Sequence, residues 1–146
     1  MGDRLDLGIT ARPVEVSVSL WWAVFSNNAS VALIVFAGVL TLGVATIAFT
    51  LVLGLMTGAS LAQAMASSGW GEMTRHVLPH GWIELPAIGV AVAAGIVPLT
   101  VTALALVGRE RPRPKIRDVL ADSLGLLGVS LVLLLIAATI ETLVST

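Results

Sequence analysis

Long uncharged stretches alternate with short polar segments along this chain, and their lengths predict helices that cross a membrane. The stretches without a charged residue are 16–71, 85–108 and 123–140. A helix needs about 20 predominantly apolar residues to cross roughly 30 Å of hydrocarbon. Each stretch can hold a crossing, so we expect an all-α, polytopic transmembrane bundle with three spanning helices. The expected spans are residues 30–55, 81–107 and 119–144.

Two further segments have patterns that fit no ordinary spanning helix. Residues 57–79 are mixed in polarity and predict an outer loop, a half-helix or a re-entrant segment, which needs protein or water around its backbone. Residues 14–25 alternate apolar and polar positions at strand period, yet Trp21, Trp22 and Phe25 are typical of an anchor at the membrane interface. For these residues we expect a short element on the membrane surface.

Two adjacent asparagines, Asn27 and Asn28, interrupt the apolar run just before the first expected span. An asparagine side-chain oxygen can accept a hydrogen bond from a free backbone N–H, so the pair predicts a helix cap. Binding of a partner is the alternative role that we retain for them.

Composition and charge place the chain in a lipid bilayer as a single domain over residues 1–146. Of its 146 residues, 57% are hydrophobic and 12% are charged, whereas soluble domains carry roughly a quarter charged residues. A chain this short has too little interior to hide so much apolar surface from water. The net charge of −1 indicates no nucleic-acid partner, and the absence of cysteine excludes disulfides and thiolate metal ligands.

The segment between the second and third expected spans predicts the orientation of the chain in the cell membrane. Residues 109–117, RERPRPKIR, hold five basic residues and one acidic residue, and short basic loops stay on the cytoplasmic side. The C-terminus then lies outside. Three crossings place the N-terminus inside, whereas a further crossing by residues 57–79 moves it outside.

Ionisable side chains inside spanning helices are candidates for function, because lipid disfavours charge. Glu84 and Glu141 are two such residues, and the predicted topology places both carboxyl groups at similar depth near the outer surface. His80 precedes Glu84 by one helical turn and shares its helix face, and His76 continues the spacing. We therefore expect a polar functional cluster of His80, Glu84 and Glu141.

Three kinds of function are compatible with this cluster. It can fix helix packing in a non-enzymatic envelope or assembly component that forms a homo-oligomer, or it can line a path for protons, ions or small solutes in a transporter or channel. It can also bind a divalent metal, since imidazole and carboxylate are ligands of zinc. The candidate metal ligands are His76, His80, Glu84 and Glu141.

An intramembrane metal-dependent hydrolase ranks last among these functions. The chain contains no His-Glu-x-x-His pattern of the kind that binds zinc in metalloproteases. We therefore assign no catalytic residue, and we predict no cofactor beyond a possible divalent metal.

The sequence LPHGWIELPAIGVAVAAG at residues 78–95 resembles the hallmark of the stage II sporulation protein M family. That family shows a leucine-proline-histidine-glycine core, two further residues, and then glutamate-leucine-proline-alanine. The sequence FSNN at 25–28 resembles its paired-asparagine motif, and AATIETL at 137–143 resembles its C-terminal helix with an embedded glutamate. Thr57-Gly58 stands where the family usually has asparagine-glycine.

The resemblance implies a multi-pass membrane protein in which five polar residues occupy the motif positions of the family. These residues are Asn27, Asn28, His80, Glu84 and Glu141. The family's named member acts in engulfment during bacterial sporulation, alongside partners that degrade the cell wall. Similar proteins are widespread in archaea and in bacteria that do not sporulate, so the resemblance implies neither a sporulation role nor a particular biochemical activity.

Overall fold

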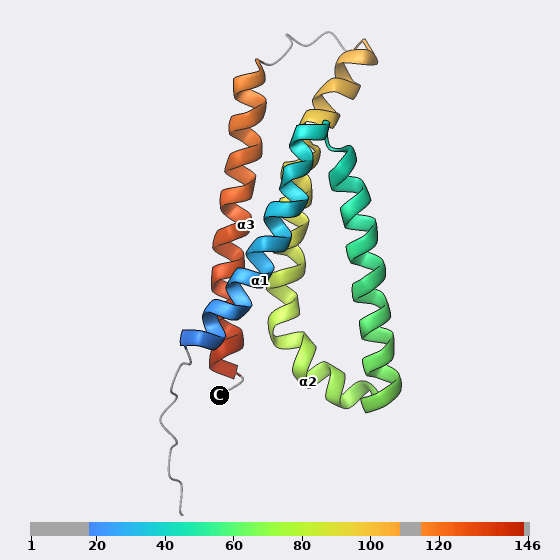
Figure 1. Ribbon diagram of the computed structural model, residues 1–146, viewed down its shortest axis with the longest axis vertical. Helices are drawn as coiled ribbons and strands as arrows, with labels where there is room; N and C mark the ends of the chain where they lie inside the picture. The colour runs from blue at the N-terminus through green and yellow to red at the C-terminus, as the bar shows by residue number, and fades with distance from the viewer. Residues whose placement is uncertain (1–17, 109–114, 145–146) are drawn as a thin grey trace, which may run out of the picture.

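The computed structural model describes residues 18–108 and 115–144, apart from the side chains of residues 72, 73, 75–80 and 144. Across this part of the chain the structure is all-α, which confirms the predicted fold class (Figure 1). The elements are α1 at Val18–Phe36, the 3-10 helix η1 at Ala37–Thr41, α2 at Val44–Leu106 and α3 at Ile116–Val144. Of the expected surface element, residues 14–17 lie outside the described residues, and the rest forms the first turns of α1.

The described helices supply four segments that are long and apolar enough to cross a membrane, one more than expected. They are Val18–Thr41, Val44–Gly71, Gly81–Leu106 and Ile116–Leu143. The last two correspond to the spans expected over residues 81–107 and 119–144. In place of one helix over residues 30–55, the chain turns back on itself after Thr41 and begins a new helix at Val44 (Figure 1).

The reversal between α1 and α2 depends on left-handed backbone conformations that leave no polar mark in the sequence. Leu42 has a φ of 53° and Gly43 a φ of 86°, and the Gly43 N–H donates to the Gly38 carbonyl at 2.8 Å. A side chain on Gly43 would be strained by this φ and crowded by Leu99 and Ile96. The uncharged run of residues 16–71 thus holds two helices and an apolar turn. Hydropathy alone does not distinguish this arrangement from one continuous apolar stretch.

A second bend divides α2 and accounts for residues 57–79. Gly69 has a φ of 76° and a ψ of 169°, outside the helical region, while the chain on either side is helical. Residues 57–79 therefore contain the end of the span Val44–Gly71 and a helical connection to the span Gly81–Leu106 (Figure 1). The helix continues through Pro86 and Pro98.

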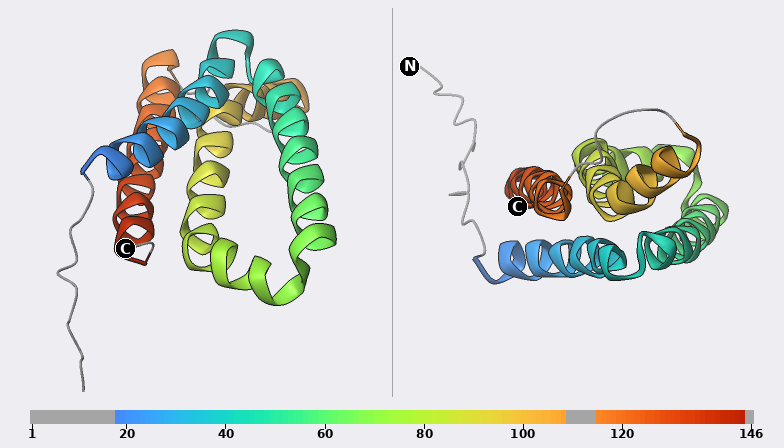
Figure 2. Two further views of the ribbon diagram at one scale, coloured as in Figure 1. Left: turned by 60° about the horizontal axis from the view of Figure 1, so that its bottom comes forward. Right: turned by 90° about the horizontal axis from the view of Figure 1, so that it is seen from above.

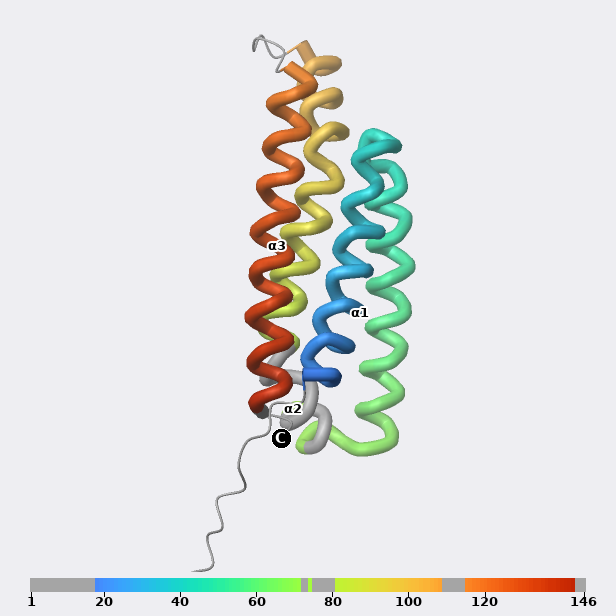
Figure 3. Tube along the Cα trace, turned by 60° about the vertical axis from the view of Figure 1, so that its left-hand side comes forward, coloured from blue at the N-terminus to red at the C-terminus, as the bar shows by residue number. Residues whose placement is uncertain are grey.

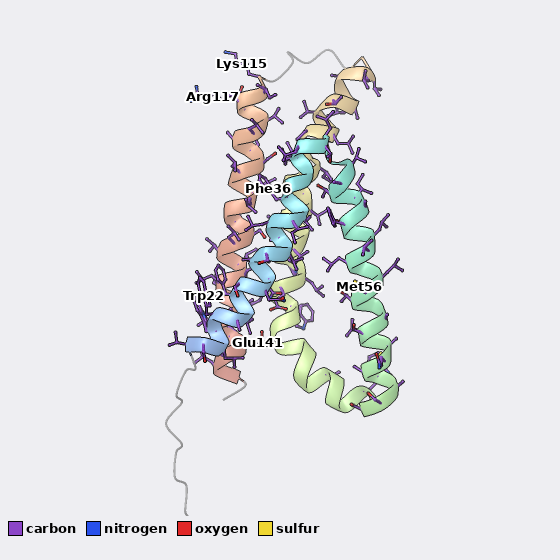
Figure 4. All side chains as sticks on the ribbon, in the orientation of Figure 1. Trp22, Phe36, Met56, Lys115, Arg117 and Glu141 are labelled. Carbon is purple, nitrogen blue, oxygen red and sulfur yellow. The ribbon has the colours of Figure 1, made fainter. Side chains whose placement is uncertain are left out.

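The two bends give the bundle two chemically different ends. At one end of the bundle, α1 begins, α2 bends at Gly69 and α3 finishes (Figure 1). We call it the aromatic end, because Trp21, Trp22, Trp70 and Trp82 lie in these parts of the helices. At the opposite end, which we call the basic end, α1 reverses into α2 and α3 starts beside Lys115 and Arg117 (Figure 4).

Small side chains make up most of the core between α1, α3 and the second half of α2. Ala32, Ala87, Ala91 and Leu134 are fully buried together, with Phe25, Ile88 and Leu133 packed around them. The α3 helix runs antiparallel beside the second half of α2 (Figure 3). A buried hydrogen bond of 2.7 Å from the Ser130 Oγ to the Ala87 carbonyl joins these two helices. Alanine at the contact lets helix backbones approach closely, which favours association in lipid.

Near the basic end, the side chain of Thr46 fills the point where α1 and both halves of α2 meet. Thr46 is fully buried, and its Oγ1 donates to the Val35 carbonyl of α1 at 2.9 Å. A Cβ added at Gly38 or at Gly95 would overlap with Thr46, and at Gly95 it would also lie 2.9 Å from the Val35 carbonyl oxygen. Glycine at both positions is therefore what allows the reversal to dock against the rest of the bundle.

The first half of α2 leaves this crossing and then stands apart from the rest of the bundle (Figures 1 and 2). Of the most apolar part of the span Val44–Gly71, 6% is buried, against 22% to 33% for the other three spans. Its apolar side chains therefore have few contacts within the chain, and lipid or another protein must surround them.

We expect replacement of Gly95 by alanine to destabilise the fold through the crossing at Thr46. The added Cβ must displace Thr46 or the α1 backbone, and overpacking of this kind costs about 1–3 kcal/mol. The measurement is the free energy of unfolding of the full chain in detergent micelles. Gly125→Ala is the matched control, because a Cβ there meets nothing within 4 Å. Equal stability of the two variants would contradict the close crossing.

Candidate functional site

A hydrogen bond between two distant polar residues of the predicted motifs lies at the aromatic end of the core. The Asn28 Nδ2 of α1 donates to the Glu84 Oε1 of α2 at 2.6 Å, although the residues are 56 positions apart in the sequence. Both side chains are half-buried. An amide N–H that donates to a carboxyl oxygen gives each group a hydrogen bond within the protein, which matters within a lipid-covered bundle.

The helix faces that form the core also bring Asn28 and Glu84 together. Asn28 lies one helical turn before Ala32, and Glu84 lies just under one turn before Ala87. Both alanines are fully buried in the core. The polar pair therefore continues the same contact surface toward the aromatic end, and the alanine packing fixes the separation of the two helices.

The predicted capping role of Asn27 and Asn28 is wrong. The α1 helix begins at Val18, so both asparagines lie well inside it and no free N–H group of a helix start is near them. Asn28 faces the bundle, whereas Asn27 is exposed. The sequence suggested a cap because the first span was expected to start after these residues.

Glu141 lies at the same end of the bundle as Glu84, but on α3. It is half-buried and falls on the helix face that carries the fully buried Leu134 and Ala137. Because α3 runs antiparallel to the second half of α2, this position is toward the aromatic end (Figure 4). The structure thus brings Asn28 and Glu84 into contact, and it places Glu141 on the neighbouring helix toward the same end.

A second polar contact ties α1 to α3 near the aromatic end. The Trp21 Nε1 donates to the Thr139 Oγ1 at 3.1 Å. The Trp21 ring stacks on Phe25 with centroids 5.6 Å apart and an interplanar angle of 14°, and Trp22 is 60% exposed (Figure 4). Indole groups favour the headgroup level of a bilayer, so these rings fit the interfacial anchor that their pattern predicts, as part of a spanning helix.

Two of the four candidate metal ligands, Glu84 and Glu141, have described side chains. His76 and His80 belong to α2, but their side chains lie outside the described residues. Among the side chains that are described, no group of three histidines, cysteines or carboxylates could hold a metal ion. The proposed participation of the two histidines therefore stays a prediction.

Sequence reasoning found Glu84 and both asparagines but missed that Asn28 is the partner of Glu84. The signal was present, since an amide residue inside an uncharged stretch needs a hydrogen-bond partner from another helix once lipid surrounds it. The contact of Trp21 with Thr139 had no comparable signal, because threonine can satisfy its own hydroxyl within the helix. Thr139 does so as well, donating to the Leu135 carbonyl at 2.9 Å.

Comparison with known proteins gives two similarities. The chain matches the family described as Stage II sporulation protein M over residues 8–146. It is also 30% identical over 123 residues to the uncharacterized protein MJ0793 of Methanocaldococcus jannaschii. This alignment covers 82% of the present chain and 67% of that protein. No solved structure matches the chain.

Loss of the Asn28 side chain should destabilise the bundle much more than loss of its neighbour. Asn28→Ala removes the donor to Glu84 and leaves a half-buried carboxyl group without this partner, so we expect a loss of about 1–2 kcal/mol in the free energy of unfolding. Asn27→Ala is the control, because Asn27 is exposed.

A double-mutant cycle with Glu84→Ala isolates the contact itself. If Asn28 acts through Glu84, Asn28→Ala has little further effect once Glu84 has been replaced. Additive losses in the double variant would show that the two residues stabilise the protein independently.

Proposed function

Because the chain belongs to the stage II sporulation protein M family, we propose that it is a non-enzymatic membrane protein that assembles with other components of the cell envelope. In this proposal His80, Glu84 and Glu141 form a polar cluster, and Asn28 is the partner of Glu84. The cluster fixes how three helices meet at the aromatic end. The observation that carries the proposal is the 2.6 Å hydrogen bond between Asn28 and Glu84.

That hydrogen bond favours a packing role over an open polar path. Van der Waals contact and interhelical hydrogen bonds drive helix association in lipid, where the hydrophobic effect between helices is small. Asn28 and Glu84 form a hydrogen bond with each other at the edge of an alanine core. A bonded pair at this position specifies one arrangement of α1 against α2. A surface that recognises partners requires such a fixed arrangement of its helices.

The separated first half of α2 supports a homo-oligomer, with other membrane or envelope proteins as further partners. Gly54 and Gly58 lie one turn apart on this helix, and a Cβ added at either would meet nothing within 4 Å. Small residues at this spacing let a second helix approach closely. We propose that a second copy packs against this span.

The charge distribution supports an orientation with the basic end in the cytoplasm. Residues 109–117 carry five basic residues, and such short loops remain inside. With four crossings, both termini and the aromatic end then face outward.

Single cysteines test this orientation on a clean background, because the natural chain has no cysteine. We expect a membrane-impermeant maleimide to label Ser68→Cys in intact cells. Leu40→Cys and Lys115→Cys should react only after permeabilisation. All three positions are exposed. Labelling of Lys115→Cys in intact cells would reverse the orientation, and protection of Leu40→Cys under both conditions would place the turn inside the bilayer.

Measurements on the purified chain in liposomes distinguish the proposed function from that of a transporter. We expect Glu84→Ala to lower the Tm by about 2–5 °C and to reduce the number of copies per assembly, counted by single-molecule photobleaching. Leu85→Ala is the matched control, because Leu85 is the exposed neighbour. We also expect no proton flux above that of empty liposomes.

Two results would contradict the proposal. A proton flux that Glu84→Gln abolishes, with the fold intact, would support a transporter. One zinc ion per purified chain, lost in His80→Ala, would support the metal-dependent hydrolase instead.

A further inference from the structure

The contact between α2 and α3 contains a buried hydroxyl group that has no partner in the described part of the chain. Ser123 is fully buried, and its Oγ makes no hydrogen bond there. The three other fully buried polar residues, Thr46, Ser130 and Thr142, each donate to a backbone carbonyl. An unsatisfied buried hydroxyl is unfavourable, so a group that completes its hydrogen bonding is expected beside it.

The register of the two helices indicates what lies opposite Ser123. The hydrogen bond from Ser130 to the Ala87 carbonyl fixes how α3 pairs with α2. Because the helices are antiparallel, a step of roughly two turns from this bond leads back to Ser123 on α3 and forward to Ala94 on α2. Ser123 and Ala94 therefore lie opposite each other. Ala94 is fully buried, as expected for a residue at this contact. One turn beyond, Val119 and Pro98 are both buried as well, which agrees with the same register.

The Ala94 carbonyl is the one that Pro98 deprives of its helical donor. In α2 the carbonyl of residue 94 would accept from the N–H of residue 98, but proline has no N–H. In membrane proteins, carbonyls freed in this way are served by Ser or Thr side chains of neighbouring helices or by ordered water. The Ala87 carbonyl differs, because residue 91 is an alanine and retains its N–H.

We propose that a single water molecule binds between the Ser123 hydroxyl and the Ala94 carbonyl, inside the contact between α2 and α3. Water is the ligand that fits both groups, since it can donate to the carbonyl and complete the bonding of the hydroxyl at once. A direct bond is not formed, because the Ser123 Oγ makes no hydrogen bond with any described residue. The site lies next to Gly95, where Thr46 packs, so it supports α2 beside the crossing of the helices.

Water-edited solid-state NMR of the full-length wild-type chain in liposomes tests the bound water directly. Polarisation that starts on water should reach the Ser123 Cβ and the Ala94 carbonyl carbon at least twice as fast as it reaches Leu134, which is fully buried in the apolar core. Equal, slow build-up at Ser123, Ala94 and Leu134 would overturn the proposal. This measurement needs no variant and does not depend on any altered chain folding.

A double-mutant cycle tests whether Ser123 acts through the carbonyl freed by Pro98. We expect Ser123→Ala to lower the folding equilibrium constant about five-fold in the natural sequence. It should have less than a two-fold effect in Pro98→Ala, where residue 98 regains its N–H. Ser130→Ala is the control, and its effect should be the same in both backgrounds, because the Ala87 carbonyl does not depend on Pro98.

The two experiments together separate the alternatives. An equal effect of Ser123→Ala in both backgrounds would overturn the link to Pro98. Coupling in the cycle without fast water polarisation would show a direct bond from Ser123 to Ala94 and would overturn the bound water.

Discussion

The close approach of helix backbones at Thr46 is the constraint on which the rest of the structure depends. Lipid removes most of the hydrophobic drive that would hold helices together in water, and what remains is contact between well-fitted surfaces and a few polar bonds. A side chain at Gly38 or Gly95 would overlap with Thr46, whose hydroxyl donates to the α1 backbone. This contact holds α1 against α2 directly beside the reversal at Leu42 and Gly43.

The polar contacts of the aromatic end are a consequence of the same geometry. Once the crossing near the basic end fixes where α1 lies on α2, the alanine faces determine which residues meet further along. Asn28 then reaches Glu84, and Trp21 reaches Thr139 on α3. Each bond alone contributes no more than about 1–2 kcal/mol in lipid, since side chains of the unfolded state also find partners. Their combined effect is specificity, because one relative position of three helices satisfies all of them.

The sequence predicted the class of the fold well and its path less well. Charge-free stretches reveal spans because the cost of a charge in hydrocarbon is large and local. They do not reveal a turn such as Leu42–Gly43, where backbone conformation and glycine packing act without any change in polarity. The same error made Asn28 look like a cap. Glu84 was recognised from its own chemistry, whereas its partner required the three-dimensional register of α1 on α2.

The rest of the bundle provides few contacts for the separated half of α2. A helix with little of its surface buried in its own chain, as is the case for Val44–Gly71, gains its stability from backbone hydrogen bonds and from lipid. Such a helix needs no intramolecular partner to remain folded in a membrane, although it would be an aggregation hazard in water. The chain can therefore leave most of one span exposed while the crossing at Thr46 and the bond between Asn28 and Glu84 hold the remaining helices in a fixed arrangement.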